Sequence, residues 1–185
     1  MQSSYQLEDE LGLVQRAQKQ DVKAFAELYE AYFDRIYRYI SLKIRDQTEA
    51  EDLTQQVFMK ALQSVSSYKC KGAPFSSWLY RIAHNHTVDY YRKHSKATIP
   101  IDDLPLTDCS HDPQKMLEQK IDVEELMEAT KHLSTAQQEV LSLRFTGDLS
   151  IKECAQIMGK SENAIKALQH SAVIALRKAL LAEVQ

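Results

Sequence analysis

Hydrophobic residues recur at helical spacing along most of this chain. Over residues 50–65, apolar side chains stand three or four positions apart and so share one helix face: Ala50, Leu53, Val57, Ala61 and Val65. Only four Gly and four Pro interrupt the sequence. The pattern therefore predicts an all-α protein, with helices near 7–19, 22–45, 49–65, 75–94, 113–131, 135–146, 151–158 and 162–181.

Capping signals support several of these helix starts. Thr48, Ser134 and Ser150 are each followed three positions later by Glu or Gln, the spacing of a capping box. Asp112 followed by Pro113 is typical of an N-cap and a first helical residue.

The stretch from residue 95 to 112 has two prolines, several turn-forming residues and little periodicity. It reads as a linker between helical parts. We therefore expect two small helical domains, residues 1–96 and 113–185, joined by a flexible acidic linker at 97–112.

Charge is segregated along the chain although the net charge is only −3. Residues 60–96 carry 7 basic groups and 1 acidic group, and residues 131–185 carry 7 and 5. Residues 97–130, between them, carry 2 and 9. Two positive blocks separated by an acidic one indicate two surfaces that face a polyanion. The pI of about 6.1 argues against a protein that coats nucleic acid without selectivity.

Several classes of protein are disfavoured by the sequence. The N-terminus is polar and acidic, unlike a signal peptide, and no apolar run approaches the roughly 20 residues that span a bilayer. The three cysteines are far apart without a CxxC pair, which fits a reducing cytoplasm and no zinc site. Without a metal-ligand spacing or a glycine-rich phosphate loop, we expect no metal, no cofactor and no enzymatic activity.

The segment from residue 68 to 96 mixes aromatic and basic side chains. Aromatic faces stack on unpaired bases and cations hold phosphates, so the mixture suits single-stranded nucleic acid. An ordinary core helix with a solvated basic end would also fit. The residues concerned are Tyr68, Phe75, Trp78, Tyr80, Tyr90 and Tyr91, with Lys69, Lys71, Arg81, Arg92, Lys93 and Lys96.

Residues 150–178 have the spacing of a helix-turn-helix. A short helix would end at Gly159, and a second would start after Ser161. Ala155 is small enough for a close helix crossing, while Ile165 and Leu168 would bury the second helix. Such units place the second helix in the major groove, although short helical hairpins can mimic the pattern. The exposed candidates for duplex contact are Ser161, Asn163, Lys166, Gln169 and His170.

The helix expected at 49–65 also has a polar stripe opposite its apolar face. By i, i+3 and i+4 spacing, one side presents Asp52, Gln55, Gln56, Met59, Lys60 and Gln63. Such a stripe is ordinarily a solvated surface, so the pattern alone does not distinguish it from a docking face.

Three segments in order now carry a family resemblance. These are Glu51–Phe58 (EDLTQQVF), Trp78–Asn85 (WLYRIAHN) and the helix-turn-helix. Together they resemble the bacterial extracytoplasmic-function sigma factors of the sigma-70 family, over about residues 21–96 (region 2) and 122–181 (region 4). Where the family usually carries an Arg behind the recognition helix, this chain has Ser171.

The resemblance implies a role for each segment. The first implies docking on the clamp helices of the largest catalytic subunit of core RNA polymerase, by Asp52, Leu53, Gln55, Gln56 and Phe58. The second implies recognition and opening of the minus-ten promoter element, including capture of a flipped base, by Tyr68, Lys69, Lys71, Phe75, Arg81, Asn85 and Arg92. The helix-turn-helix implies reading of the minus-thirty-five element.

The resemblance thus implies a non-enzymatic promoter-specificity subunit. Its expected partners are core polymerase, promoter DNA and an anti-sigma factor, without membrane insertion. One alternative is a helix-turn-helix regulator that binds duplex DNA and never touches polymerase. The other, an all-α enzyme, has no supporting motif.

Overall fold

The computed structural model describes residues 3–44, 46–69, 73–94, 129–130 and 132–183, which fall into two compact units, Met1–Ser95 and Lys96–Gln185. Every regular element within these ranges is helical, so the prediction of an all-α protein is confirmed. The expected linker at 97–112 and nearly all of the expected helix at 113–131 lie outside the described residues. None of the described helices is long and apolar enough to cross a membrane.

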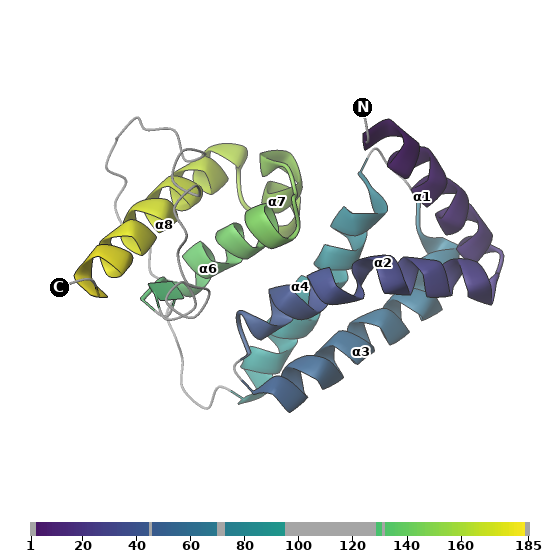
Figure 1. The fold of residues 1–185 in the computed structure, drawn as a ribbon, viewed down its shortest axis with the longest axis horizontal. Coiled ribbons are helices and arrows are strands. Elements are labelled where there is room, and N and C mark those ends of the chain that lie inside the picture. The colour runs from purple at the N-terminus through teal and green to yellow at the C-terminus, as the bar shows by residue number, and fades with distance from the viewer. Residues whose placement is uncertain (1–2, 45, 70–72, 95–128, 131, 184–185) are drawn as a thin grey trace. The chain divides into compact units, whose positions relative to one another are not determined.

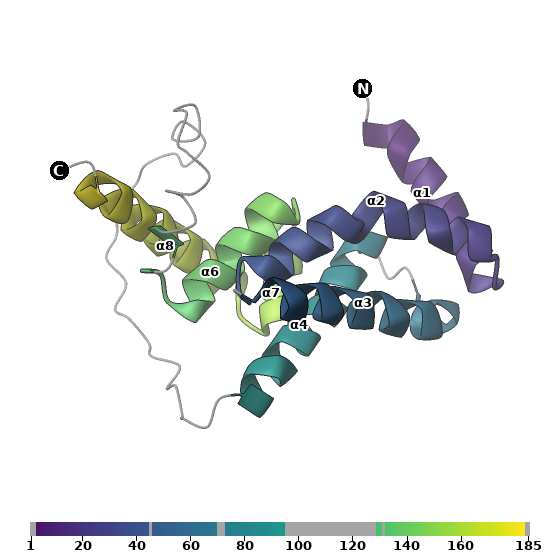
Figure 2. The same cartoon turned by 60° about the horizontal axis from the view of Figure 1, so that its bottom comes forward.

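The first unit is a bundle built from α1 (Ser3–Gln18), α2 (Val22–Ser41), α3 (Gln47–Ser64) and α4 (Phe75–His94), with a 3-10 turn, η1 (Val65–Ser67), after α3. Helices α2 and α3 lie side by side, α4 packs on both, and α1 contacts α2, η1 and α4 (Figures 1 and 2).

The centre of this bundle is apolar and aromatic. Tyr39 of α2 and Tyr80 of α4 are fully buried and meet edge to face at 5.3 Å between ring centroids. Aromatic pairs prefer such offset geometries, which add to the stabilisation from burial. The apolar face predicted for α3 is confirmed, because the five residues that define it are all buried: Ala50, Leu53, Val57, Ala61 and Val65.

Several helix limits in this unit differ from the sequence prediction, and α1 begins at Ser3, four residues earlier than expected. Helix α2 ends at Ser41, four residues earlier than expected. Helix α3 begins after Asp46, whose carboxylate accepts a hydrogen bond from the Glu49 N–H at 3.0 Å, so the predicted capping box at Thr48 is wrong. Asp caps a helix as well as Thr does, and Asp46 stands first in the chain.

The second unit contains α6 (Thr135–Leu141), a π-helical turn η3 (Ser142–Thr146), α7 (Ile151–Met158) and α8 (Glu162–Glu183). Capping boxes at Ser134 and Ser150 start α6 and α7 as predicted. The core joins these elements through fully or nearly fully buried side chains: Val140, Leu143, Leu149, Cys154, Ile165 and Ala172.

The turn between α7 and α8 follows the predicted helix-turn-helix closely. Gly159 adopts a left-handed conformation, with φ of 64°, and the next N–H, that of Lys160, returns to the Ala155 carbonyl at 3.0 Å. Ser161 then caps α8, since its Oγ accepts a hydrogen bond from the Ala164 N–H. Ala155 and Ile165 are buried where the two helices meet.

Candidate functional site

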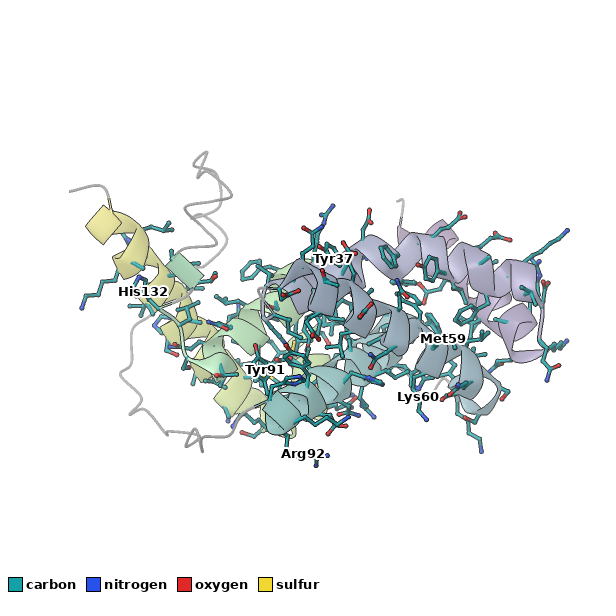
Figure 3. All side chains as sticks on the ribbon, turned by 90° about the horizontal axis from the view of Figure 1, so that it is seen from below. Tyr37, Met59, Lys60, Tyr91, Arg92 and His132 are labelled. Atoms are coloured by element: carbon teal, nitrogen blue, oxygen red, sulfur yellow. The ribbon has the colours of Figure 1, made fainter. Side chains whose placement is uncertain are left out.

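The polar stripe of α3 is an exposed ridge. Asp52, Gln55 and Gln56 are all exposed, as are the neighbouring Met59 and Lys60 (Figure 3). Met59 is 59% exposed, so it presents apolar area to solvent beside these polar side chains. An exposed methionine among amides and a carboxylate is a mixed surface that can adapt to another protein.

Two residues assigned to this surface lie elsewhere. Leu53 is 6% exposed and Phe58 is 5% exposed, so both side chains belong largely to the core of their own unit. Phe58 packs against α2, with its ring 4.7 Å from that of Tyr29 and 6.1 Å from that of Phe33. Leu53 thus lies on the apolar face that its spacing predicted, and the docking role that the resemblance implied for Leu53 and Phe58 is corrected, because both side chains hold α3 in place.

A second exposed ridge runs along α4. Arg81, Asn85, Val88 and Arg92 are spaced four, three and four residues apart and are all exposed, so they share one face of the helix. Arg92, at the outer end of α4 in Figure 3, pairs with Asp89 at 3.1 Å. Both partners are well exposed, and such pairs contribute little, so the guanidinium can exchange its carboxylate for a phosphate.

Val88 was missed by the sequence reasoning. It is 50% exposed in the middle of this ridge. An apolar residue at helical spacing is normally assigned to the core, so only the observed orientation of α4 reveals it.

Aromatic residues from the first turn of α4 and from the segment before it form a cluster rather than an open platform. Tyr68 is 9% exposed and Phe75 is 3% exposed, and their rings meet edge to face at 5.7 Å. The ring of Trp78, which is half-buried, lies 5.0 Å from Tyr68 and 5.3 Å from Phe75. The expectation that Tyr68 and Phe75 themselves meet a base is corrected, because these rings are used to pack the segment.

The basic residues expected beside this cluster are only partly described. Lys69 is exposed directly after Tyr68, while Lys71 lies outside the described residues. Lys69, Arg81 and Arg92 are therefore the exposed cations among the residues expected to meet the minus-ten element.

A groove of about 240 Å³ separates α3 from α4, lined by Glu49, Leu53, Gln56, His86, Asp89, Tyr90, Lys93 and His94. Partial burial lowers the pKa of His86, and the positive charges of Lys60 and Lys93 act in the same direction, while Asp89 opposes them. Gln56 of the α3 ridge lines this groove together with residues of α4.

The first turns of α8 present polar side chains at the end of the helix-turn-helix. Ser161, Asn163 and Lys166 are exposed. Asn163, Lys166 and His170 are spaced three and four residues apart, so they share one face. Amide and ammonium groups on one face of such a helix are able to bind base edges and phosphates.

Two of the residues expected on this surface are less accessible. Gln169 is half-buried, and its Oε1 accepts a hydrogen bond from the Arg144 Nε at 3.3 Å. His170 is also half-buried, with a buried Nε2 that has no hydrogen-bond partner. The expectation that Gln169 faces solvent freely is corrected, because η3 holds its side chain.

Ser171, where an Arg was expected from the resemblance, serves the packing of the unit. Its Oγ accepts a hydrogen bond from the Gln137 Nε2 at 3.3 Å and donates one to the Leu168 carbonyl at 3.0 Å. The hydroxyl thus links α6 to α8. Across the described part of the chain, no group of three or more His, Cys, Asp or Glu side chains is placed to hold a metal ion.

Comparison with known proteins assigns both parts of the chain to one family. Residues 28–97 match the family model of sigma-70 region 2, and residues 123–176 match that of sigma-70 region 4. The two matches contain, respectively, the ridges of α3 and α4 and the helix-turn-helix.

Among curated relatives, the chain is 36% identical over 171 residues to the ECF RNA polymerase sigma factor BldN of Streptomyces coelicolor, covering 91% of this chain and 64% of that protein. It is 31% identical over 143 residues to the ECF sigma factor SigM of Bacillus subtilis, covering 77% of this chain and 86% of SigM. The chain therefore spans about two thirds of BldN's length and most of SigM's.

Among solved structures, the fold is similar to CnrH in complex with the cytosolic domain of CnrY, with a TM-score of 0.70 at 22% identity over 94% of this chain and 98% of that one. RpoE of Bartonella quintana, solved in complex with the anti-sigma factor NepR, gives a TM-score of 0.67 at 22% identity, over 86% of this chain and 98% of that one. The chain matches both regions in the family's order, and its relatives align over most of its length. These matches identify its family. The chain belongs to the extracytoplasmic-function group of sigma-70 factors, the non-enzymatic subunits that direct RNA polymerase to specific promoters.

Proposed function

We propose that the α3 ridge is the surface on which this sigma factor docks with the clamp helices of the largest catalytic subunit of core polymerase. Asp52, Gln55 and Gln56 are the exposed members of the expected set. The observation that carries the proposal is that these three side chains are exposed on a helix whose opposite face is packed in the core. Met59, exposed beside them, adds apolar area that a docked partner would bury.

The α4 ridge and Lys69 are proposed to receive the minus-ten element. Arg81, Arg92 and Lys69 hold phosphates, Asn85 offers hydrogen bonds to a base edge, and half-buried Trp78 leaves part of its ring to stack. A captured base contributes about 1–3 kcal/mol, against about 1.4 kcal/mol for one DNA stacking step. One or two captured bases therefore offset local opening, and the polymerase must supply the remainder.

The first turns of α8 are proposed to read the minus-thirty-five element in the duplex. Exposed Ser161, Asn163 and Lys166 are nearest to the helix start, where backbone N–H groups also favour a phosphate. In this scheme, residues 1–96 form the minus-ten module and residues 113–185 the minus-thirty-five module.

An anti-sigma factor is the proposed inhibitor of the free protein. The two solved structures with similar folds are complexes, one with the cytosolic domain of CnrY and one with the anti-sigma factor NepR. A partner that covers the α3 ridge would block docking on polymerase. The proposed place of action is the cytoplasm, where core polymerase and promoters are found.

Run-off transcription tests this function. The purified chain is mixed with bacterial core polymerase and a pool of random-sequence promoter templates, and transcripts are selected and sequenced. We expect a shared minus-ten and minus-thirty-five motif in the selected templates. The absence of any promoter-dependent transcript would overturn the proposal.

Substitutions then separate the surfaces. Asp52→Ala and Gln56→Ala are expected to weaken core binding, measured by fluorescence anisotropy, whereas Lys166→Ala lowers promoter selectivity with core affinity unchanged. Thr48→Ala, exposed on the first turn of the same helix, is the matched control. Unchanged core affinity in both α3 variants would refute the docking assignment.

The match to sigma-70 region 2 favours this function over the alternative raised by the sequence, a helix-turn-helix regulator that acts without polymerase. The alternative predicts tight binding of the chain alone to duplex DNA, usually as a dimer on a palindrome. Gel-shift titration of the chain with and without core polymerase distinguishes the two, because the sigma function requires polymerase for selective binding.

A further inference from the structure

Two neighbouring residues of α4 have the opposite burial from the one that their polarity predicts. Thr87 is 2% exposed, and its hydroxyl donates within the helix to the carbonyls of Ala83 and His84, at 2.9 and 2.8 Å. Val88, the next residue, is 50% exposed. The two side chains have similar shapes, yet the fold buries the polar one and leaves the apolar one in solvent. The burial of apolar area therefore does not account for a valine at position 88.

Val88 stands in the middle of the α4 ridge. At about 100° per residue, the four exposed ridge residues, Arg81, Asn85, Val88 and Arg92, fall within about 60° of the helix circumference. Arg81 precedes Asn85 by about 6 Å along the axis, and Arg92 follows Val88 by about the same distance. A cation thus stands at each end of the row. Cations at these two places suit phosphates, which carry no sequence information, and the two central side chains are left for the bases.

The edge of a base offers one kind of apolar group to such a side chain. In the major groove, which admits an α-helix, the base edges present hydrogen-bond donors and acceptors together with the 5-methyl group of thymine. The amide of Asn85 can pair with donors and acceptors, whereas Val88 has no polar atom in its side chain. A valine pressed against a polar edge would remove water from that edge without replacing its hydrogen bonds, which costs free energy. Val88 therefore favours thymine over the other bases.

We propose that Val88 is a specificity-determining residue, which selects thymine at one position of the minus-ten element by packing against its 5-methyl group. Promoter DNA is the partner of a sigma factor, and the inference rests on the proposed role of the α4 ridge in binding the minus-ten element. Asn85, one turn earlier on the same face, then reads a neighbouring base.

Deoxyuridine tests this contact, because uracil pairs as thymine does and lacks only the 5-methyl group. The test uses holoenzyme assembled from core polymerase and the full chain. The probes are fluorescent forked DNAs with a minus-ten sequence selected by the wild-type holoenzyme, in which each thymine of either strand is replaced in turn. We expect one replacement to weaken wild-type binding about fourfold, the loss that corresponds to one buried methyl group.

Val88→Ala should bind the thymine and deoxyuridine forms of that probe equally, because the methyl group has lost its partner. A comparison of two probes within one variant cancels any change in folding or in core binding, since such a change affects both probes alike. Val22→Ala is the matched control, at a valine that is 78% exposed in the first turn of α2. It should keep the wild-type difference between the two forms.

Two results would overturn the inference. One is a difference between thymine and deoxyuridine that persists in Val88→Ala. The other is the absence of any thymine at which deoxyuridine weakens wild-type binding.

Asn85→Ala and Arg81→Gln separate a failure of the inference from a failure of the proposed function. If these variants bind the minus-ten probes more weakly than the wild type does, the role of the α4 ridge is supported independently of Val88. If both bind like the wild type, the proposed minus-ten role of α4 fails, and the inference about Val88 fails with it.

Discussion

Arg144 donates from its Nε to the Oε1 of Gln169 at 3.3 Å, across 25 positions of sequence. The same guanidinium donates from a terminal nitrogen to the carbonyl of Leu149. One side chain of the π-helical turn η3 thereby contacts both the turn ahead of α7 and the second helix of the helix-turn-helix. This arrangement fixes α8 relative to α7 without using the surface proposed for DNA.

Replacing Arg144 by Met should therefore destabilise the second unit. We expect a loss of about 1–3 kcal/mol in the free energy of unfolding, because the change leaves the partly buried Gln169 and Leu149 oxygens without their donor. Hydrogen exchange of amides in α6, α7 and α8 measures this directly. Arg177→Met, on an exposed part of α8, should change little. Equal protection in the two variants would show that the Arg144 contacts contribute nothing.

Replacing glycine by alanine should change the stability of the chain in opposite directions at two positions. Gly159 has a φ of +64° and Gly12 lies inside α1, and an added Cβ would meet nothing within 4 Å at either position. Gly159→Ala should destabilise the chain by about 1–2 kcal/mol, since an L-residue is strained in the left-handed region. Gly12→Ala should stabilise it by about 0.5–1 kcal/mol, through helix propensity.

Urea denaturation followed by circular dichroism compares the two glycine variants. A loss of stability at both positions would mean that steric contacts, and not backbone conformation, dominate. Gly159→Asn provides a further check, because Asn tolerates the left-handed conformation better than Ala and should recover part of the loss.

His86 makes a defined contribution to the pH dependence of stability. Burial lowers its pKa in the folded protein below the ordinary value of 6.5, so the folded state favours the neutral ring. This preference for the neutral ring stabilises the folded state fully above pH 6.5. The stabilisation is lost as the pH falls below 6.5 toward the lower pKa of His86 in the folded protein. His86→Gln should therefore flatten the fall in unfolding free energy over that interval.

Thermal denaturation on both sides of pH 6.5 measures the effect of His86. His132→Gln, at an exposed histidine in the second unit, is the control. If His86→Gln and His132→Gln show the same dependence of stability on pH, the contribution assigned to His86 is wrong.

Cys154 should resist alkylation in the folded protein. It is fully buried, and burial raises the pKa of its thiol to about 11. Because the thiolate is the reactive form, iodoacetamide should label Cys154 only when the second unit opens. The experiment uses the double variant Cys70→Ser and Cys109→Ser, with labelling followed by mass spectrometry. Rapid labelling without denaturant would contradict the burial of Cys154.

Local sequence predicted the helix ends that depend on local chemistry. Ser134, Ser150 and Gly159 behave as expected, since capping and left-handed turns involve atoms only a few residues apart. At α3 the same reasoning chose Thr48, whereas Asp46 is the cap. Two acceptable caps close together cannot be ranked from local pattern alone.

The family and its two modules were also predictable, because the EDLTQ, WLYRIAHN and helix-turn-helix segments are contiguous in the sequence. Which of their side chains remain accessible was not. Phe58 and Tyr68 are covered by residues from other elements, and the pattern that marks a helix face does not say what packs against it.

By itself, then, the sequence determined the all-helical fold class, the caps at Ser134 and Ser150 and the sigma-factor family, because these follow from short-range spacing and contiguous motifs. Only the tertiary structure decided that Phe58 supports the α3 ridge instead of forming it, and that Val88 joins the α4 ridge. It alone brought Gln18 to Tyr68 and Arg144 to Gln169. Such pairings depend on how whole helices pack, and packing is set by the combined burial of side chains far apart in the chain.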